Sequence, residues 1–287
     1  MRDQHIINIR VMTHSDIEFG YQLATEIEDW GYKKEDIKRL LYYEPNGCFV
    51  AEKRGQKIGI VTTTIYGKIA HLGTLIVLPA YRGYGIGTAL MEHALNHLEN
   101  CGVETIKLDA VTKAIPLYER LGFQKIFLSL RFNGFGKIGS DSKVTRMKKH
   151  DLSDVAALDQ QYSGLQRKIV LNSLYNATPD LCFLYRENNR LLGFIMTRKS
   201  INQYKIGPWI CDPDYEGVSE KLLKKVLNQA NNNLLWVGVP GGNKKAVVIL
   251  KKNGFKQRTS SMRMVRGEEH TSEDILGIFG IGSPEKG

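Results

Sequence analysis

Residues 74–87 read TLIVLPAYRGYGIG and decide how the first half of the chain folds. The apolar run 75–78 is typical of a strand buried on both faces, and Pro79 ends it because proline withholds a ladder donor. The glycines of 82–87 remove side chains that would keep a ligand off the backbone, so several amide N–H groups can converge on one anion. From Gly85 the apolar residues recur at helical spacing, and the helix dipole adds to that site. The stretch predicts a strand, a phosphate-binding turn and a helix.

Two better-known phosphate turns do not fit this stretch. No Gly-Lys-Ser or Gly-Lys-Thr follows the last glycine, which disfavours a nucleotide-hydrolase loop. The spacing R-G-x-G-x-G also differs from the G-x-G-x-x-G of dinucleotide-binding folds. A tight strand-to-helix connection without a ligand is the alternative interpretation.

A second motif follows one amphipathic helix later, where residues 107–109 lead into AIPLYERLGF at 114–123. Together the two stretches resemble the GNAT N-acetyltransferase superfamily, and Arg82, Gly85 and Gly87 fit its acyl-coenzyme A pyrophosphate loop. The resemblance implies an acetyl-coenzyme A cosubstrate and no metal. It also implies that the cofactor is held by Leu75, Ile76, Val77, Arg82, Gly83, Tyr84, Gly85, Ile86, Gly87 and Thr88.

The length and composition of the chain limit its domain organisation, its compartment and its partners. The chain has 287 residues, of which 42% are hydrophobic, enough for two domains with real cores. No apolar run reaches the length of a bilayer span and no secretory signal is evident, so we expect a cytoplasmic protein without membrane contact. The four cysteines are scattered and predict reduced thiols.

The net charge of +10 is suited to binding the cofactor's phosphates or simply to solubility. Nucleic acid is disfavoured as a partner because the basic residues form no run and no binding motif is present.

The order of elements in the first half predicts an α/β fold of mixed α+β type. A first strand near 6–12 precedes a helix that Ser15 and Glu18 would cap, and 48–53 and 57–65 form a hairpin. The resulting order, β-α-α-β-β-β-α-β-α-β, is that of the superfamily. We expect a catalytic domain over 1–131, a glycine-rich linker over 132–142 and a second domain over 143–287.

The second half repeats the first. Phe49 and Gly59 recur as Phe183 and Gly193, both 134 residues on (183−49 and 193−59), and Pro79 recurs as Pro213. At this offset the turn 82–87 faces 216–221, EGVSEK, which has lost two of three glycines and carries a carboxylate in place of Arg82. The pattern predicts two tandem GNAT-like domains, of which the second is degenerate. The chain resembles a little-characterised tandem subgroup of this kind at Trp30, 44–47, 108–110, 116–118 and 263–267.

The resemblance implies direct transfer, in which an amine attacks the thioester of acetyl-coenzyme A. Tyr118 matches the family's general acid, and a tyrosine near its usual pKa of about 10 is protonated at neutral pH. Its counterpart at offset 132 is Leu250, which cannot donate a proton. The alternative is that Tyr118 only packs or hydrogen bonds near the sulfur.

The general base and the acceptor are the least determined features. His71 and Glu28 are candidates for the base, with a buried strand histidine and a solvated helix end as their structural alternatives. Four aromatic residues are candidates for the acceptor pocket, where they could hold an amine by cation–π contact or could simply belong to the core: Trp30, Tyr32, Tyr43 and Tyr66.

We therefore predict an acetyl-coenzyme A-dependent N-acetyltransferase for a small-molecule or peptide amine. The alternative is a non-catalytic acyl-coenzyme A sensor, which would not need Tyr118. The second domain would shape the acceptor pocket or a subunit interface, and a homodimer is one expected assembly.

Overall fold

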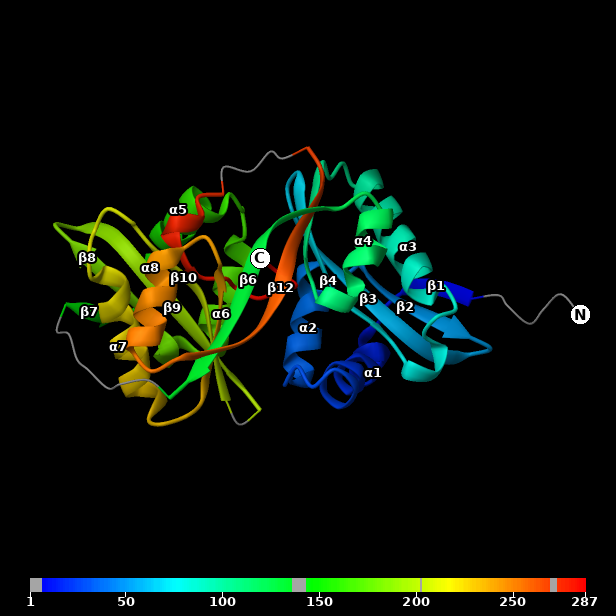
Figure 1. Ribbon diagram of the computed structural model, residues 1–287, viewed down its shortest axis with the longest axis horizontal. Helices are drawn as coiled ribbons and strands as arrows, with labels where there is room; N and C mark the ends of the chain where they lie inside the picture. The colour runs from blue at the N-terminus through cyan, green and yellow to red at the C-terminus, as the bar shows by residue number, and fades with distance from the viewer. Residues whose placement is uncertain (1–6, 136–142, 202, 269–272) are drawn as a thin grey trace, which may run out of the picture.

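The computed structural model describes residues 7–135, 143–201, 203–268 and 273–287 (Figure 1). The first copy of the repeat follows the predicted order: β1 (Ile7–Val11), α1 (Ile17–Gln22), α2 (Lys34–Tyr43), β2 (Cys48–Lys53), β3 (Gln56–Tyr66), β4 (Ile69–Val77), α3 (Ile86–Asn100), β5 (Thr105–Ala110), α4 (Ile115–Arg120) and β6 (Gln124–Gly134).

The second copy has the same order of elements, followed by one short extra strand. Its members are β7 (Val144–Arg146), α5 (Leu152–Ser163), α6 (Lys168–Ala177), β8 (Cys182–Glu187), β9 (Arg190–Ser200), β10 (Gln203–Cys211), α7 (Val218–Ala230), β11 (Leu235–Pro240), α8 (Lys244–Lys252) and β12 (Lys256–Gly267), and then β13 (Ile278–Gly280). The mixed α/β fold and the tandem repeat are confirmed.

The two copies share one continuous sheet because they exchange their last strands. The order is β1-β2-β3-β4-β5-β12-β6-β11-β10-β9-β8-β7, with β13 on β10. Strand β12 of the second copy lies antiparallel between β5 and β6 of the first, and β6 pairs on its other side with β11. Figure 1 shows β6 and β12 side by side between the two halves. Each copy thus borrows a strand from the other.

Strand β6 runs to Gly134, three residues into the stretch predicted as a linker. Phe132 is fully buried in the core of the second copy, which explains why the strand continues. Residues 136–142 lie outside the described residues.

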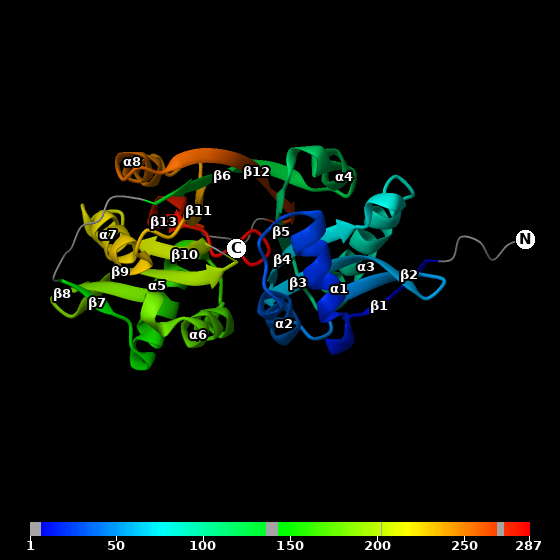
Figure 2. The same ribbon diagram turned by 90° about the horizontal axis from the view of Figure 1, so that it is seen from below.

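Helices cover both faces of each half of the sheet (Figure 2). In the first copy α3 packs on one face with the hydrophobic cluster around Leu90 and Ala94, and α1 and α2 pack on the other around Leu40. Tyr43, Tyr66 and Ile69 belong instead to a core cluster shared with the second copy. That shared apolar core and the exchanged strands join the two halves.

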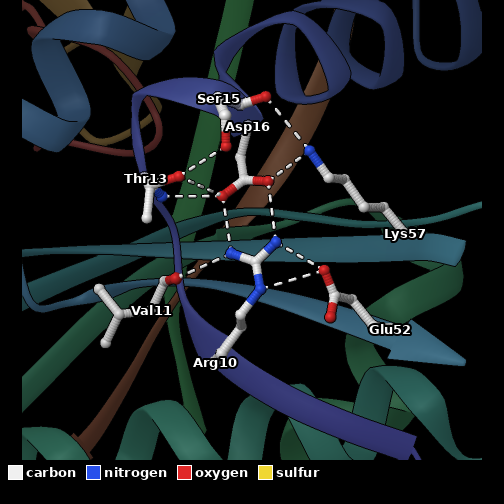
Figure 3. Close-up of polar contacts among 7 residues, drawn as sticks. All are labelled: Arg10, Val11, Thr13, Ser15, Asp16, Glu52 and Lys57. Carbon is white, nitrogen blue, oxygen red and sulfur yellow. Dashed lines mark hydrogen bonds and ion pairs between the residues drawn. The ribbon is translucent and has the colours of Figure 1, made fainter. Parts of the chain in front are cut away.

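The first helix is capped differently from the prediction. Asp16, not Glu18, accepts the hydrogen bond from the Thr13 amide at 2.8 Å, and the helical region ends at Ile27. The Asp16 carboxylate is fully buried and is held by Arg10 at 2.8 Å and by Lys57 (Figure 3). A buried carboxylate must be hydrogen bonded, and the backbone N–H groups at the start of the helix are one source of such bonds. Asp16 therefore caps the helix in place of Glu18.

Candidate active site

Strand β4 separates from β5 halfway along its length. The two strands pair in parallel only from Ile69 to His71, opposite Thr105 to Lys107. Beyond that point a bulge shifts the pairing of β4 with β3, and Thr74 there has a left-handed φ of +49°. Bulges bend a strand away from its neighbour. The free edge of β4 after the bulge, residues 75–77, therefore faces an open slot.

The predicted glycine turn closes one end of that slot. Gly83 and Gly85 have φ of +84° and +79°, and a β carbon on either would meet no atom within 4 Å. Helix α3 starts directly after Gly85, so its first-turn N–H groups lack intrahelical partners and point outward. Left-handed glycines, open space and a helix N-terminus are the features that an anion-binding turn requires.

A large cavity of about 1300 Å³ runs from this turn to the second copy. Nine of the ten residues predicted to hold the cofactor line it; Tyr84 does not, and its side chain is 77% exposed. The far wall comes from the second copy and the C-terminal segment. It includes Arg198, Gln203, Lys205, Trp236, Ser261 and Glu285.

Tyr118 lies on the wall of this cavity. It projects from α4, is 8% exposed, and packs edge-on against Phe123 at 5.9 Å between ring centroids. Burial raises the pKa of Tyr118 to about 12, because the apolar surroundings disfavour the phenolate. The side chain is thus protonated throughout the neutral range.

The two candidates for the general base lie in different places. Glu28 lines the cavity, but its carboxylate pairs with Arg82 of the glycine turn at 2.7 Å. His71 is fully buried and lines a separate small cavity of about 10 Å³, with Lys107 and Arg167. Burial, reinforced by nearby cations, holds the pKa of His71 well below its usual value. The structure brings Glu28 to the turn and places His71 outside the main cavity.

The four predicted acceptor aromatics also separate into two pairs. Trp30 and Tyr32 line the cavity, and Lys205 of the second copy donates to the Trp30 carbonyl at 2.7 Å. Tyr43 and Tyr66 are not among the residues that line it. They pack in the apolar core shared by the two copies, and the Tyr66 hydroxyl donates to the carbonyl of Lys286 at 3.0 Å. Their spacing in sequence could not distinguish an interface from a pocket.

Asp109 lines the cavity but is already engaged. Its buried carboxylate accepts from Arg263 of β12 at 2.8 Å and lies 3.8 Å from Arg131. Burial acts to raise the pKa of Asp109, but the two arginines outweigh it and hold the pKa below its usual value. This ion pair fastens the exchanged strand to β5.

Sequence reasoning missed the contribution of the C-terminal segment. Residues 281–285 line the cavity, and Glu285 packs so closely on Gly73 that a β carbon there would lie 2.4 Å from the β carbon of Glu285. The Glu285 carboxylate is buried and pairs with Lys286. Burial acts to raise its pKa, but Lys286 and Arg198 hold the pKa far below the usual value. The segment has no periodic pattern that could have placed it beside β4.

The glycine turn of the second copy is two residues shorter than the sequence comparison assumed. Gly85 lies eight positions after Val77 (85−77), but Gly217 lies only six positions after Cys211 (217−211). Each glycine immediately precedes a helix and has a φ near +80°. Gly85 therefore corresponds to Gly217, not to Ser219. Carboxylates still dominate the shorter turn: Asp212, Asp214 and Glu216.

Among the described residues, no cluster of three or more histidine, cysteine or acidic side chains is arranged to hold a metal ion. No helix within the described part of the chain is both long and apolar enough to cross a membrane.

Comparisons with known proteins agree with this geometry. Residues 17–123 match the acetyltransferase (GNAT) family, and residues 155–280 match a second family described as an acetyltransferase (GNAT) domain. A holothin acyltransferase of Pseudoalteromonas sp. is 22% identical over 250 residues, 86% of this chain and 83% of that protein. A mycothiol acetyltransferase of Streptomyces avermitilis is 39% identical over 94 residues, 31% of this chain and 30% of that protein. A crystal structure from Pyrococcus horikoshii, described as a candidate acetyltransferase, superposes with a TM-score of 0.82 at 25% identity and covers 100% of this chain and 99% of that one.

Proposed function

Because the chain belongs to the GNAT acetyltransferase family, we propose that it transfers an acetyl group from acetyl-coenzyme A directly to an amine of a small molecule or peptide. The observation that carries this proposal is the cavity itself. It joins the glycine turn, the free edge of β4 and Tyr118 in the first copy to a polar wall in the second. One continuous space thus offers room for an acyl carrier and for an acceptor.

The first copy supplies the groups that would hold the cofactor. The outward N–H groups of the turn and the first turn of α3 suit the pyrophosphate, and Arg82 lies beside them. The open backbone edge at Leu75 and Ile76 can bind the extended pantetheine as an added strand would be bound, and the Val77 carbonyl already accepts from Arg82 Nε at 2.9 Å. The Arg82–Glu28 ion pair holds the arginine at the turn.

Tyr118 is proposed as the general acid that protonates the departing thiolate. Its buried position and a pKa raised to about 12 keep the proton on the phenol until a thiolate forms. For the base we favour neither original candidate. His71 lies outside the cavity and Glu28 is paired, so we propose that water in the cavity carries the amine proton away.

The acceptor is proposed to lie between the copies, with Trp30 and Tyr32 on one side and the strands β10 and β11 on the other. The relatives named for holothin and mycothiol support a small-molecule acceptor. In this scheme residues 1–131 carry the catalytic groups, and residues 143–287 form a degenerate copy that completes the acceptor side.

The test is thiol release from acetyl-coenzyme A across a panel of amines, amino acids, polyamines, aminoglycosides and lysine peptides. An active amine should be found, and Tyr118→Phe should lower kcat about 100-fold while leaving coenzyme A binding nearly unchanged by calorimetry. Tyr81→Phe, at another tyrosine of the cavity wall, is the matched control. If Tyr118→Phe retains full turnover, the acid role is wrong. If the coenzyme binds but no acceptor releases thiol, the sensor alternative gains support.

A further inference from the structure

Two nitrogen donors in the cavity wall have no partner in the structure as described. They are Nη1 of Arg131 on β6 and Nε1 of Trp236 on β11, and both atoms are buried from solvent. A buried donor without an acceptor costs free energy comparable to a lost hydrogen bond. Such groups occur where a bound molecule supplies the missing partner.

The two donors lie on the same face of neighbouring strands. In the antiparallel pair β6–β11, Arg131 stands opposite Gly238 and Asn133 opposite Trp236, so the side chains of Arg131, Asn133 and Trp236 share one side of the sheet. The guanidinium lies over Gly238, because a β carbon there would be only 2.4 Å from Nη1. Trp236 precedes Gly238 by two residues, roughly 7 Å along the strand. A small planar anion that displaces the groups covering these two buried atoms would meet both donors on one face of the sheet.

The surroundings leave this part of the wall with an excess of positive charge. The nearest carboxylate, Asp109, has its own cation in Arg263 at 2.8 Å, and the carboxylate of Glu285 pairs with Lys286. Neither of these two cations lines the cavity. Arg131 also lies 3.8 Å from Asp109, so it shares that carboxylate with Arg263, which in turn shares Glu273 with Lys107. Three cations thus face two carboxylates, and one positive charge is in excess.

Hydroxyl groups extend the same surface on the other side of Arg131. Its Nη2 donates to Ser261 of β12 at 2.9 Å, and Thr259 of β12 pairs with Arg131 in the sheet and also lines the cavity. Strands β12, β6 and β11 are adjacent only because the copies exchange strands. The polar surface thus belongs to neither copy alone.

We propose that Arg131 and Trp236 bind a carboxylate of the acceptor, so that the preferred substrates are amines that also carry a carboxylate, such as amino acids and short peptides. This inference rests on the proposed acetyl transfer, because it assigns the second substrate of the same cavity. A charge-assisted hydrogen bond from Arg131 supplies most of the affinity, and the indole N–H fixes the orientation of the carboxylate. The amine is then held toward the slot beside β4.

Matched pairs of acceptors test the proposal by turnover. An amino acid or peptide is compared with its own carboxamide, which keeps the amine and removes the anionic charge. We expect KM for the acid to be about 10- to 100-fold lower than for the amide. Arg131→Gln should abolish this preference by raising KM for the acid only. Trp236→Phe should raise KM for the acid several-fold. Arg258→Gln, at an arginine of the same sheet that does not line the cavity, should change neither value. Equal KM values for acid and amide in the wild-type protein would overturn the proposal.

A binding measurement decides the question even if no amine is acetylated. N-acetylglycine, which keeps the carboxylate of an acetylated product, is titrated into the full chain saturated with coenzyme A. We expect heat of binding in the wild-type protein and in Arg258→Gln. The heat should be lost in Arg131→Gln and weakened in Trp236→Phe, and this pattern would support the subsite independently of turnover. Trp236→Phe keeps the aromatic packing, so it remains informative if Arg131→Gln fails to fold. Absence of binding in the wild-type protein, or equal binding in Trp236→Phe and wild type, would contradict the subsite.

Discussion

The two copies of the repeat have the same slot but use it differently. In the first copy β4 and β5 separate after three paired residues and the space between them is open. In the second copy β10 and β11 also pair over three residues, from Tyr204 to Ile206, but the space beyond them holds β13. Phe279 of β13 packs against Trp209 at 5.4 Å between ring centroids. The same split between strands is thus an open cavity in one copy and core in the other.

The C-terminal segment makes the difference, because it passes both slots. Ile281 contacts Gly207 in the bulge of β10, and Glu285 contacts Gly73, the equivalent residue of β4 at offset 134 (207−73). In the second slot the segment is hydrogen bonded to β10, but in the first it lies against Gly73 of β4 and the cavity stays open. The C-terminal end lies between the halves in both views of Figures 1 and 2. The second copy has thus lost its own open slot, and its C-terminal segment forms part of the wall of the cavity in the first copy.

The largest expected effect comes from separating the copies. Residues 1–138 expressed alone should fail to fold, because β5 and β6 would each lose their pairing with β12, and Asp109 would be left buried without Arg263. The measurement is solubility together with the thermal unfolding transition. Co-expression with residues 139–287 is the control, since each part then supplies the strand that the other lacks. A soluble, cooperatively unfolding 1–138 fragment would show that the copies are independent domains.

The next effect concerns the two glycine turns, which offer a matched pair of substitutions. Gly85→Glu and Gly217→Glu both place a side chain on a left-handed glycine with open space above it, so they should cost similar stability. Only Gly85→Glu should lower coenzyme A affinity, by at least about 100-fold, because its carboxylate repels phosphate. Calorimetry measures the affinity and thermal unfolding the stability. Equal losses of affinity would mean that both copies bind the coenzyme.

Local signals in the sequence were sufficient to predict the order of helices and strands in the first copy and its glycine turn. Gly83 and Gly85 take the left-handed conformation that the turn needs, the hairpin turns at Arg54–Gly55, and residues 74–87 form the predicted strand, turn and helix. These features depend on a few neighbouring residues, and so their residue types report them directly. The offset between Gly59 and Gly193 likewise located the repeat, since both begin the same bulged pairing in their hairpins.

The interactions between the copies could not be predicted in this way. Strand β12 pairs with β5 about 150 residues away in sequence, and either β5 or β11 would have suited its apolar pattern. The shortened turn before Gly217 was misaligned by two residues because a constant offset hides where a deletion lies. Glu285 and Arg131 were missed for a related reason. Their role depends on which strands become neighbours, and no local pattern encodes that.

The smallest expected effect concerns the paired ends of the two slots, where equivalent positions hold titratable side chains, one fully buried and one partly buried. His71 of β4 and Lys205 of β10 are 134 residues apart (205−71), the offset of the repeat. Burial lowers the pKa of His71 well below its usual value and lowers the pKa of Lys205 to about 8. In each case the unfolded chain binds a proton at a pH where the folded chain does not. The free energy of unfolding therefore rises with pH in each window, by at most about 1.4 kcal/mol per pH unit.

The windows differ, which allows the two side chains to be told apart. The His71 contribution is lost as pH falls below about 6.5, the usual pKa of histidine, and the Lys205 contribution grows between pH of about 8 and 10.5. His71→Gln should lose less stability to denaturant at acid pH than the wild-type protein, and Lys205→Met should lack the gain in the free energy of unfolding that Lys205 gives between pH of about 8 and 10.5. His150→Gln, at an exposed surface histidine, is the control. If His71→Gln keeps the acid sensitivity of the wild-type protein, the histidine must be able to accept a proton in the folded state. Its exclusion as the catalytic base would then have to be withdrawn, because protonation would require a path from the cavity to the paired end of the slot.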